Sequence, residues 1–532
     1  MSAVQNKAPA LVRPVTSESA FQGQFDSQIV AVCLVLWIQR TTGNQGCNAS
    51  HHSQEVTTKF VQRGYPIRSA STNAPDSQSF TMPIAERLAT DSYADHVNPH
   101  WVKLLSLLEM NLRYERCVGT ELFTTDGLRI LDFLSGYSVH NAGHNHPAIV
   151  AALKDELDKS GPVMLQSNVP ELAGELAERL CKLAGGVLSK VFFASSGSEG
   201  VETAIKFARA HTGRVGLLSC DRAFHGLTCG ALSLMNGEYW RKGFGPLLPE
   251  TVTVPFGDLA ALEKELASKR YAAFFVEPIQ AEGGIRVPQP DYLRGAQDLC
   301  RRYGTLLVAD EVQTGMFRTG PFLASHHFGI TPDLVVLAKA LSGGLVPVSA
   351  VLMSDAIHGS VFSSFKRSIV HASTFSENSL SMRAGLATLD VLESEKLGDR
   401  ATRMGMELQQ QLTATLSGYE MVKEVRGKGL LLGIEFTAPR RLALRVPFEA
   451  FAKIHPAMFG QILVMRLFRD GGILTQICGN DFMGLKVAPP LVVTPQQIGE
   501  FVSAVRDVVE LAHHPGSFWS EALGLARRAI SA

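Results

Sequence analysis

The stretch that decides the fold is VFFASSGSEGVETAIKFARAHTG, residues 191–213. It opens with a short apolar run that predicts a buried strand, and a Ser-Ser-Gly turn then predicts a break before a helix. Apolar side chains recur in that helix at the i, i+3, i+4, i+7 spacing of one face, at Val201, Ala204, Ile205 and Ala208. Ser196 and Glu199 have the capping-box spacing at its start, and Gly213 can end it. The stretch therefore predicts one strand–turn–helix unit.

The same alternation continues outward toward the C-terminus. Near-continuous apolar runs predict three further buried strands, at 272–276, 305–309 and 334–337. Helical stretches lie between them, which is typical of a mostly parallel sheet covered by helices on both faces. We therefore predict an α/β fold, with a large domain built on a mostly parallel sheet and a smaller α+β C-terminal domain.

Four segments are expected along the chain. Residues 1–81 are rich in Ser, Thr, Gln and Asn and are expected to form a loosely ordered extension. Residues 82–135 are expected to join the small domain, 136–380 to form the large domain, and 381–532 to form the small domain itself. The longest fully apolar run, at 29–38, is too short to span a bilayer, so no membrane span is predicted.

The composition narrows the class of protein. The chain has 532 residues, of which 45% are hydrophobic and 19% charged, and this excludes a wholly disordered chain. Lys plus Arg and Asp plus Glu both number 50, and the zero net charge argues against a dedicated nucleic-acid binder. The 8 cysteines are scattered and form no CxxC pair, which predicts free thiols in a reducing, cytoplasmic compartment.

Three features at predicted strand ends carry chemistry, because ligands of open α/β sheets lie at the carboxyl ends of the strands. The small residues at 195–198 let backbone N–H groups approach a phosphate at a helix start. Asp310 ends one buried strand and Lys339 follows the next. Taken singly, these features also fit a capped helix, a buried salt bridge and a lysine that reaches solvent. Together they match pyridoxal phosphate (PLP), which needs an anion site, an acid for its ring nitrogen and a lysine.

The chain from about 116 to 500 resembles a class III (fold type I) PLP-dependent aminotransferase. It is most similar to the ornithine δ-aminotransferase branch, which includes hopanoid side-chain transaminases. The resemblance rests on long motifs in the family's order, namely DFLSGYSVHNAGHNHP, SSGSEGVETAIKFAR, FHGLT, VEPIQAEGG, ADEVQTGMFRTG, PDLVVLAKALSGGLVPVSAV, STFSENSL, VRGKGLLLGIEF and APPLVV. It implies an enzyme that moves an amino group from a primary amine to a 2-oxo acid.

The resemblance also implies roles for individual residues in holding PLP. Lys339 matches the Schiff-base lysine, Asp310 the partner of the pyridinium nitrogen, and Phe224 the aromatic side chain on the cofactor ring. Gly197 and Ser198 match the phosphate turn. The remaining candidates for the cofactor site are His225, Glu277, Val312 and Gln313.

Other matched positions concern the substrate and a second subunit. Tyr137 and Glu282 match residues that shape the substrate pocket. Ser373 and Thr374 match the phosphate contact that a neighbouring subunit donates. The resemblance therefore implies a homodimer or a higher assembly with a shared active site.

Two positions depart from the ornithine branch. Leu227 stands where that branch has an arginine for the α-carboxylate of the substrate, and Lys486 stands where it has an arginine for the keto acid. Arginine offers a carboxylate a bidentate fork, lysine offers a point charge, and leucine offers neither. We therefore expect ornithine to be a poor substrate and the donor either to lack an α-carboxylate near its reacting amine or to present it elsewhere.

The sequence leaves several alternatives open. A same-fold aminomutase, racemase or decarboxylase would share the lysine and the acid, and a non-catalytic relative would keep the fold. The apolar residues at helical spacings in 448–466 fit either a wide apolar mouth of the site or ordinary core. His144 and His146 could suggest a metal pair, but they lie in a turn of a matched family motif, so no metal is predicted.

Overall fold

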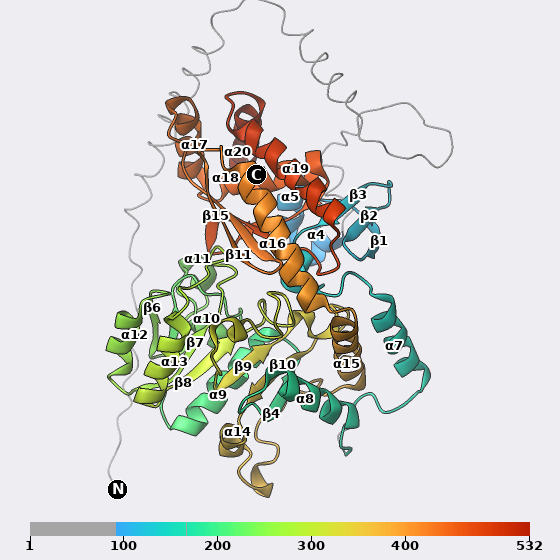
Figure 1. Cartoon of the computed structure of the whole chain (residues 1–532), viewed down its shortest axis with the longest axis vertical. Helices are drawn as coiled ribbons and strands as arrows, with labels where there is room; N and C mark the ends of the chain where they lie inside the picture. Colours follow the sequence, from blue (N-terminus) through green and yellow to red (C-terminus); the bar gives the residue numbers. More distant parts are fainter. Residues whose placement is uncertain (1–91, 166, 532) are drawn as a thin grey trace, which may run out of the picture. The chain divides into compact units, whose positions relative to one another are not determined.

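The computed structural model describes residues 92–165 and 167–531, with side chains described as far as residue 525 (Figure 1). The segment 1–81, which we expected to be loosely ordered, lies outside the described residues. Two further segments that the sequence predicted, the large sheet and the smaller C-terminal region, lie within them.

A seven-stranded sheet is built from the middle of the chain, in the order β4-β10-β9-β8-β7-β5-β6. Its strands are β4 (Lys190–Ala194), β5 (Gly216–Cys220), β6 (Thr251–Val254), β7 (Tyr271–Val276), β8 (Leu306–Asp310), β9 (Leu334–Leu337) and β10 (Ser349–Met353). Strands β5 to β9 pair in parallel, whereas β10 runs antiparallel to both β4 and β9. The predicted mostly parallel sheet is confirmed.

Helices cover both faces of this sheet, because successive side chains of a strand point to opposite faces. Val336 packs in the cluster that contains α9, whereas Val335 and Leu337 pack in the cluster that contains α8 and α15. One face carries α9 (Gly197–Thr212) and α14 (Asp355–Val361), and the other carries α8 (Glu171–Ala184), α12 (Leu259–Leu266), α13 (Tyr292–Tyr303) and α15 (Ser379–Ser394).

Helix α9 begins and ends close to where the sequence predicted. Ser196 is its N-cap and accepts a hydrogen bond from Glu199 N at 3.2 Å. The capping box is only half formed, because the Glu199 carboxylate accepts from Ser195 N at 2.7 Å instead of from Ser196 N. The helix ends at Gly213, whose φ of 68° is the left-handed conformation that favours glycine.

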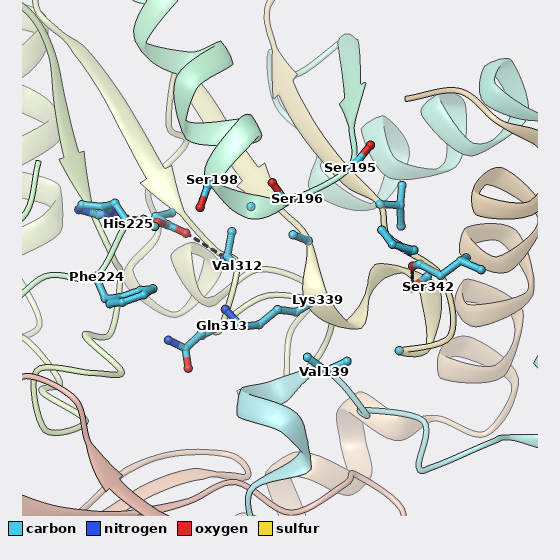
Figure 2. Close-up of a pocket in the computed structure, with 18 of the residues that line it drawn as sticks. Val139, Ser195, Ser196, Ser198, Phe224, His225, Val312, Gln313, Lys339 and Ser342 are labelled. Atoms are coloured by element: carbon cyan, nitrogen blue, oxygen red, sulfur yellow. Dashed lines mark hydrogen bonds and ion pairs between the residues drawn. The ribbon is translucent and has the colours of Figure 1, made fainter. Parts of the chain in front are cut away.

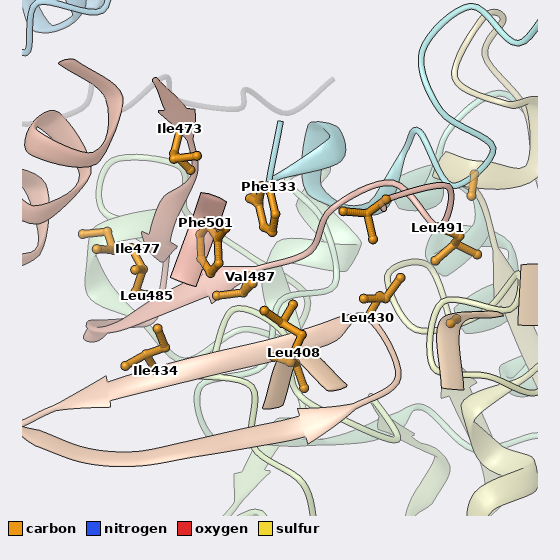
Figure 3. Packing of buried hydrophobic residues seen from close by; sticks show 14 of the residues in the cluster. Phe133, Leu408, Leu430, Ile434, Ile473, Ile477, Leu485, Val487, Leu491 and Phe501 are labelled. Atoms are coloured by element: carbon orange, nitrogen blue, oxygen red, sulfur yellow. The ribbon is translucent and has the colours of Figure 1, made fainter. Parts of the chain in front are cut away.

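A smaller antiparallel sheet follows in the order β11-β12-β15-β14. Its strands are β11 (Val422–Lys428), β12 (Leu431–Phe436), β14 (Gln476–Cys478) and β15 (Asp481–Val487), and its helices are α16 (Leu397–Leu416), α18 (Met458–Gly471) and α19 (Pro495–Ala512). Phe133 from the N-terminal region stacks on Phe501 of α19 in the core beside this sheet, with ring centroids 4.0 Å apart (Figure 3). The predicted α+β character of the region is confirmed.

A third sheet joins strands from distant parts of the chain. It contains β1 (Tyr114–Val118), β2 (Glu121–Thr124), β3 (Arg129–Asp132) and β13 (Ile473–Leu474). Strand β13 pairs in parallel with β3, so residues before the large sheet share hydrogen bonds with residues near the smaller sheet.

The apolar stretch 448–466 belongs to the core. Phe451 and Phe459 are buried, and the Phe451 ring stacks on Trp519 with an interplanar angle of 1°. Of the two alternatives, ordinary core is therefore the correct one. The remaining helical elements are α4 (Ser92–His96), α5 (Pro99–Leu107), α6 (Ser135–Ser138), α7 (Pro147–Asp158), α10 (Cys229–Ser233), α11 (Glu238–Arg241), α17 (Leu442–Ile454), α20 (Ser517–Ser531), η1 (Ala324–Phe328), η2 (Lys339–Ser342) and η3 (Phe365–Arg367). Within the described part of the chain, no helix combines the length and the apolar character needed to cross a membrane.

Candidate active site

A cavity of about 470 Å³ lies where β4, β8 and β9 end (Figure 2). The predicted residues that line it are Gly197, Ser198, Phe224, His225, Glu277, Asp310, Val312, Gln313 and Lys339. The cofactor-site candidates from separate motifs thus meet at one place, apart from Ser373 and Thr374.

Lys339 lies two residues after the end of β9 and is the first residue of η2. Its φ of 47° is a left-handed conformation that side-chain-bearing residues adopt only when the surrounding structure enforces it. Lys339 is half-buried in the cavity wall, and desolvation of its amine lowers the pKa of Lys339 below its usual value. A larger share of this lysine is therefore unprotonated and nucleophilic.

Asp310 and His225 form a buried pair on the same cavity. His225 Nδ1 lies 2.8 Å from Asp310 Oδ2, and Val312 N donates to Asp310 Oδ1 at 3.1 Å. Burial alone would lower the pKa of His225, but the hydrogen bond and the charge of Asp310 outweigh burial and raise it. His225 Nε2 is buried and has no hydrogen-bond partner among the described residues.

Glu277 holds the backbone around the cavity. Its carboxylate accepts hydrogen bonds from Phe224 N and from Ala281 N, each at 3.0 Å. Burial, together with the nearby charge of Asp310, raises the pKa of Glu277 to about 7. The group therefore titrates close to neutral pH, unlike an ordinary glutamate.

The turn before α9 brings backbone close to the cavity. A Cβ on Gly197 would lie 3.1 Å from a methyl group of Val312, and a Cβ on Gly226 would lie 2.2 Å from Ser198 Oγ. Gly226, whose φ is 121°, therefore needs to be glycine, and a side chain at Gly197 would press on Val312. The N–H groups of the first turn of this 16-residue helix face the cavity end, which is an anion-binding arrangement.

Three substrate candidates form a second cluster beside the cavity. Lys486 is fully buried, forms an ion pair with Glu282 and lies over the Tyr137 ring, 4.7 Å from its centroid. Gln313 Nε2 donates to Glu282 Oε1 at 3.2 Å and so links this cluster to the cavity. Burial would raise the pKa of Glu282, but Lys486 outweighs burial and lowers it.

Three other predicted residues lie outside the cavity lining. Leu227 is 53% exposed, and its backbone N donates to Ser198 Oγ at 3.3 Å. Thr374 is exposed and Ser373 half-buried, and neither lines the cavity of its own chain. The two histidines considered as metal ligands each contact a carboxylate instead, His144 that of Asp132 and His146 that of Glu395.

Arg318 is a site-supporting residue that the sequence did not single out. It is fully buried and donates to Ser135 Oγ at 3.0 Å, Asn141 Oδ1 at 3.1 Å and Leu430 O at 3.1 Å. Burial lowers its pKa to about 9. The guanidinium thus ties the turn that carries Tyr137 to the smaller sheet. Arg318 is part of the motif ADEVQTGMFRTG, but the motif does not indicate which residues the side chain contacts.

Residues 106–509 match the family model of class-III aminotransferases. The chain belongs to this family. Such aminotransferases are PLP-dependent transaminases, so the predicted family, the fold type I architecture, the PLP cofactor and the transaminase class are confirmed.

Class-III relatives and solved structures cover most of the chain. The aminotransferase PigE of Serratia sp. is 37% identical over 79% of this chain and 53% of its own length, so the chain spans about half of that relative. The putrescine aminotransferase of Pectobacterium atrosepticum is 36% identical over 73% of this chain and 80% of its own. The ornithine aminotransferase of Toxoplasma gondii superposes with a TM-score of 0.67 at 31% identity, covering 75% of this chain and 90% of that one. A PLP-bound amine transaminase from an uncultivated Pseudomonas species reaches a TM-score of 0.68 at 29% identity, covering 82% and 99%.

Proposed function

We propose that this class-III aminotransferase takes the amino group of a terminal primary amine and passes it to a 2-oxo acid. The observation that carries the proposal is the half-buried Lys339, whose amine shares one cavity with the Asp310–His225 pair. A lysine and an acid at neighbouring strand ends suit a carbonyl cofactor whose ring nitrogen has to stay protonated.

Unpartnered polar atoms support a polar ligand in the cavity. His225 Nε2 and Gln313 Oε1 are buried there without hydrogen-bond partners among the described residues. Leaving such groups unpaired is costly, so a ligand with polar ring substituents fits the space.

Five lining residues would hold PLP. Gly197 and Ser198 at the start of α9 would hold its phosphate, Phe224 and Val312 would flank its ring, and Asp310 would face the ring nitrogen. Bound PLP supplies an electron sink for the carbon that carries the amine.

The chain itself supplies the proton transfers. Lys339 Nζ can accept the proton of the amine-bearing carbon and return it, because its lowered pKa favours the unprotonated amine. His225 Nδ1 and Val312 N hold the Asp310 carboxylate in place.

The donor proposed is a terminal primary amine that carries no carboxylate. Leu227 lies beside the phosphate turn and offers no hydrogen bond to a carboxylate from its side chain. One relative supports this choice, since it is named a putrescine aminotransferase and putrescine carries no carboxylate.

The acceptor would bind through Lys486. Its ammonium is paired with Glu282, so the carboxylate of a 2-oxo acid has to replace that of Glu282. Lysine offers this carboxylate a point charge, whereas arginine would offer two parallel hydrogen bonds. We therefore expect a moderate affinity for the 2-oxo acid and a loosely fixed orientation of its carboxylate.

A homodimer is part of the proposal. Ser373 and Thr374 would contact the phosphate bound to a second copy of the chain. Phe365 and Ile369, which precede them, are 95% and 84% exposed, and such apolar exposure supports an interface. We place the enzyme in the cytoplasm, which the free state of the 6 described cysteines supports.

The test is a half-reaction followed by cofactor absorbance. The protein is loaded with PLP and mixed, without acceptor, with putrescine, a long-chain primary amine, β-alanine, glutamate or ornithine. We expect the first two to convert the cofactor and a 2-oxo acid to restore it.

Two outcomes would contradict the proposal. Turnover of the amine without any second substrate would indicate an aminomutase, racemase or decarboxylase. Failure to bind added PLP would indicate a non-catalytic relative. Rapid conversion by ornithine at low concentration would contradict only the proposed choice of donor.

A further inference from the structure

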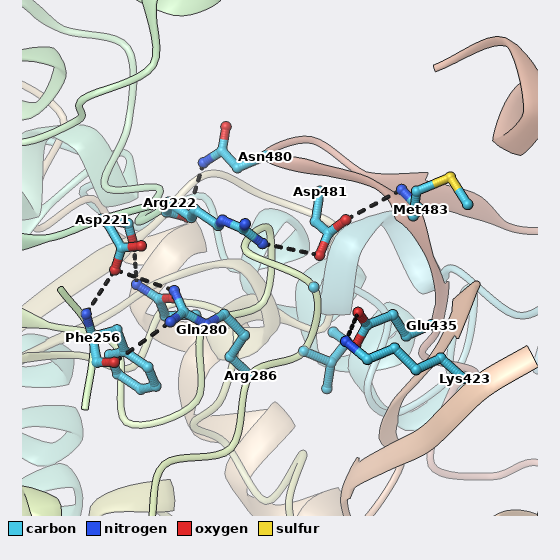
Figure 4. Close-up of polar contacts among 12 residues, drawn as sticks. Asp221, Arg222, Phe256, Gln280, Arg286, Lys423, Glu435, Asn480, Asp481 and Met483 are labelled. Atoms are coloured by element: carbon cyan, nitrogen blue, oxygen red, sulfur yellow. Dashed lines mark hydrogen bonds and ion pairs between the residues drawn. The ribbon is translucent and has the colours of Figure 1, made fainter. Parts of the chain in front are cut away.

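The turn between β14 and β15, formed by Gly479 and Asn480, is hydrogen-bonded to the loop that follows β5 (Figure 4). Asn480 Nδ2 donates to the backbone oxygens of Arg222 and Ala223, each at 3.0 Å. Its Oδ1 accepts from Trp240 Nε1 at 2.7 Å. Both hydrogens and the oxygen of this one amide are therefore used between the smaller sheet and the large one.

Trp240 lies directly behind the aromatic wall of the cavity. Its ring meets the Phe224 ring edge to face, with centroids 5.4 Å apart and an interplanar angle of 76°. Ala223, whose oxygen accepts from Asn480, is the residue before Phe224. Asn480 thus fixes Phe224 twice, through the preceding backbone and through the indole that backs its ring.

The same turn also supports the second wall. Asn480 N donates to Glu282 O at 2.9 Å, and Gly479 N donates to Glu282 Oε2 at 2.8 Å. The fit is close, since a Cβ on Gly479 would lie 3.1 Å from Glu282 Oε2 and 3.3 Å from Trp240 Cζ2. One turn therefore contacts the supports of both the ring wall and the carboxylate cluster.

We propose that Asn480 is a positioning residue for the cofactor ring, acting through Trp240 and Ala223 on Phe224. Asn480 and Trp240 lie outside the cavity lining and touch no reacting atom. Their hydrogen bond preforms the wall against which the ring binds, so that binding does not have to order it. This inference rests on the proposed function, because it concerns PLP held in that cavity.

The experiment compares Asn480→Ala, Trp240→Phe and the double variant. The apoprotein is titrated with PLP, free PLP is measured after ultrafiltration, and visible circular dichroism reports the asymmetry around the bound ring. We expect each single variant to raise the dissociation constant about threefold to tenfold, the scale of one aromatic contact, and to weaken the dichroism. The double variant should be little worse than Asn480→Ala, because both changes remove the same hydrogen bond.

Asn111→Ala is the matched control. Asn111 is a half-buried asparagine outside the site whose amide donates to Ser106 Oγ at 3.3 Å. Its loss should leave the dissociation constant and the dichroism unchanged. Asn480→Asp keeps the acceptor for Trp240 but loses both donors and turns a carboxylate oxygen toward the carbonyl oxygens of Arg222 and Ala223, so its effect should be at least as large as that of Asn480→Ala.

The inference fails if Asn480→Ala is less stable to heat but binds PLP with wild-type affinity and dichroism, because Asn480 would then be merely structural. Additive effects in the double variant would also overturn it. If Asn480→Ala does not fold, the inference is tested by Trp240→Phe alone, at a half-buried position, through the dissociation constant for PLP and the visible dichroism. If the wild-type chain does not bind PLP, the proposed function fails instead.

Discussion

Lys339 combines an unfavourable backbone conformation with a desolvated amine. Its left-handed φ and its desolvated amine each cost folding free energy, and the structure retains both at the cavity. Residues at functional sites typically combine such features that reduce the stability of the fold.

Replacing Lys339 should separate activity from stability. We expect Lys339→Ala to lower transamination by at least about 10³-fold, because the proton carrier is lost. The melting temperature should stay the same or rise, since a buried amine is removed. Steady-state kinetics and calorimetry check this, and retained activity in a folded variant would refute the assignment.

Glu277 should make stability depend on pH. Its pKa rises from 4.5 in the unfolded chain to about 7 in the fold, so the folded state binds the proton more tightly between these values. Its contribution to stability is full below pH 4.5 and is lost as the pH rises through 7. Across this window the loss is on the order of 3 kcal/mol.

The measurement for Glu277 is urea unfolding from pH 4.5 to 8 on wild type and Glu277→Gln. Glutamine cannot titrate, so the difference in unfolding free energy between the two should change with pH in that direction. A difference that stays constant with pH would show that Glu277 keeps an ordinary pKa.

Leu227 should set the preference against α-amino acids. Leu227→Arg supplies a carboxylate fork beside the phosphate turn, and we expect kcat/KM for ornithine to rise about tenfold to hundredfold. Leu227→Met is the control, because it keeps an apolar side chain. Equal kinetics of the two variants with ornithine would mean that position 227 does not meet the substrate.

At the scale of elements, the strands were predictable and their partners were not. Strand β9 coincides with the predicted 334–337, because a strand buried on both faces reads as a continuous apolar run. The ion pair of Lys486 with Glu282 joins residues 204 positions apart, and Trp240 bonds a residue 240 positions away. No short-range pattern encodes such pairs. The resemblance supplied the first pair's positions, but nothing pointed to Asn480 or Trp240.

Two glycines in helices should respond oppositely to the same change. In α16, a Cβ on Gly405 would lie 2.0 Å from Gly429 O, a backbone atom that cannot move aside. In α19, a Cβ on Gly499 meets nothing within 4 Å. We expect Gly405→Ala to destabilise the fold by about 1–3 kcal/mol and Gly499→Ala to stabilise it by up to about 1 kcal/mol. Chemical denaturation checks both, and a stable Gly405→Ala would refute the close packing of α16.

At the scale of the whole molecule, the proposed dimer depends on a strongly exposed apolar segment. Phe365→Glu with Ile369→Glu should produce monomers, because two charges would be buried at the interface. The monomer should also hold PLP more weakly, since Ser373 and Thr374 of a second copy would be missing. Light scattering and PLP titration measure the two effects.

The control for the dimer is Leu442→Glu, at an exposed apolar position on α17. It should change neither the molar mass nor the affinity for PLP. A double variant that stays dimeric would show that the interface lies elsewhere. A monomer with undiminished PLP affinity would show that Ser373 and Thr374 do not contact the cofactor.

The reversed direction of β10 limits how this enzyme can adapt. Because β10 runs against β9, the chain between them turns back at the strand end that carries Lys339, and the residues from Gly344 to Val348 become a cavity wall. Lys339 and that wall thus lie in the same connection between β9 and β10, so a shift of one displaces the other. A variant that accepts bulkier amines therefore has to gain its room at another part of the lining, away from the connection that carries Lys339.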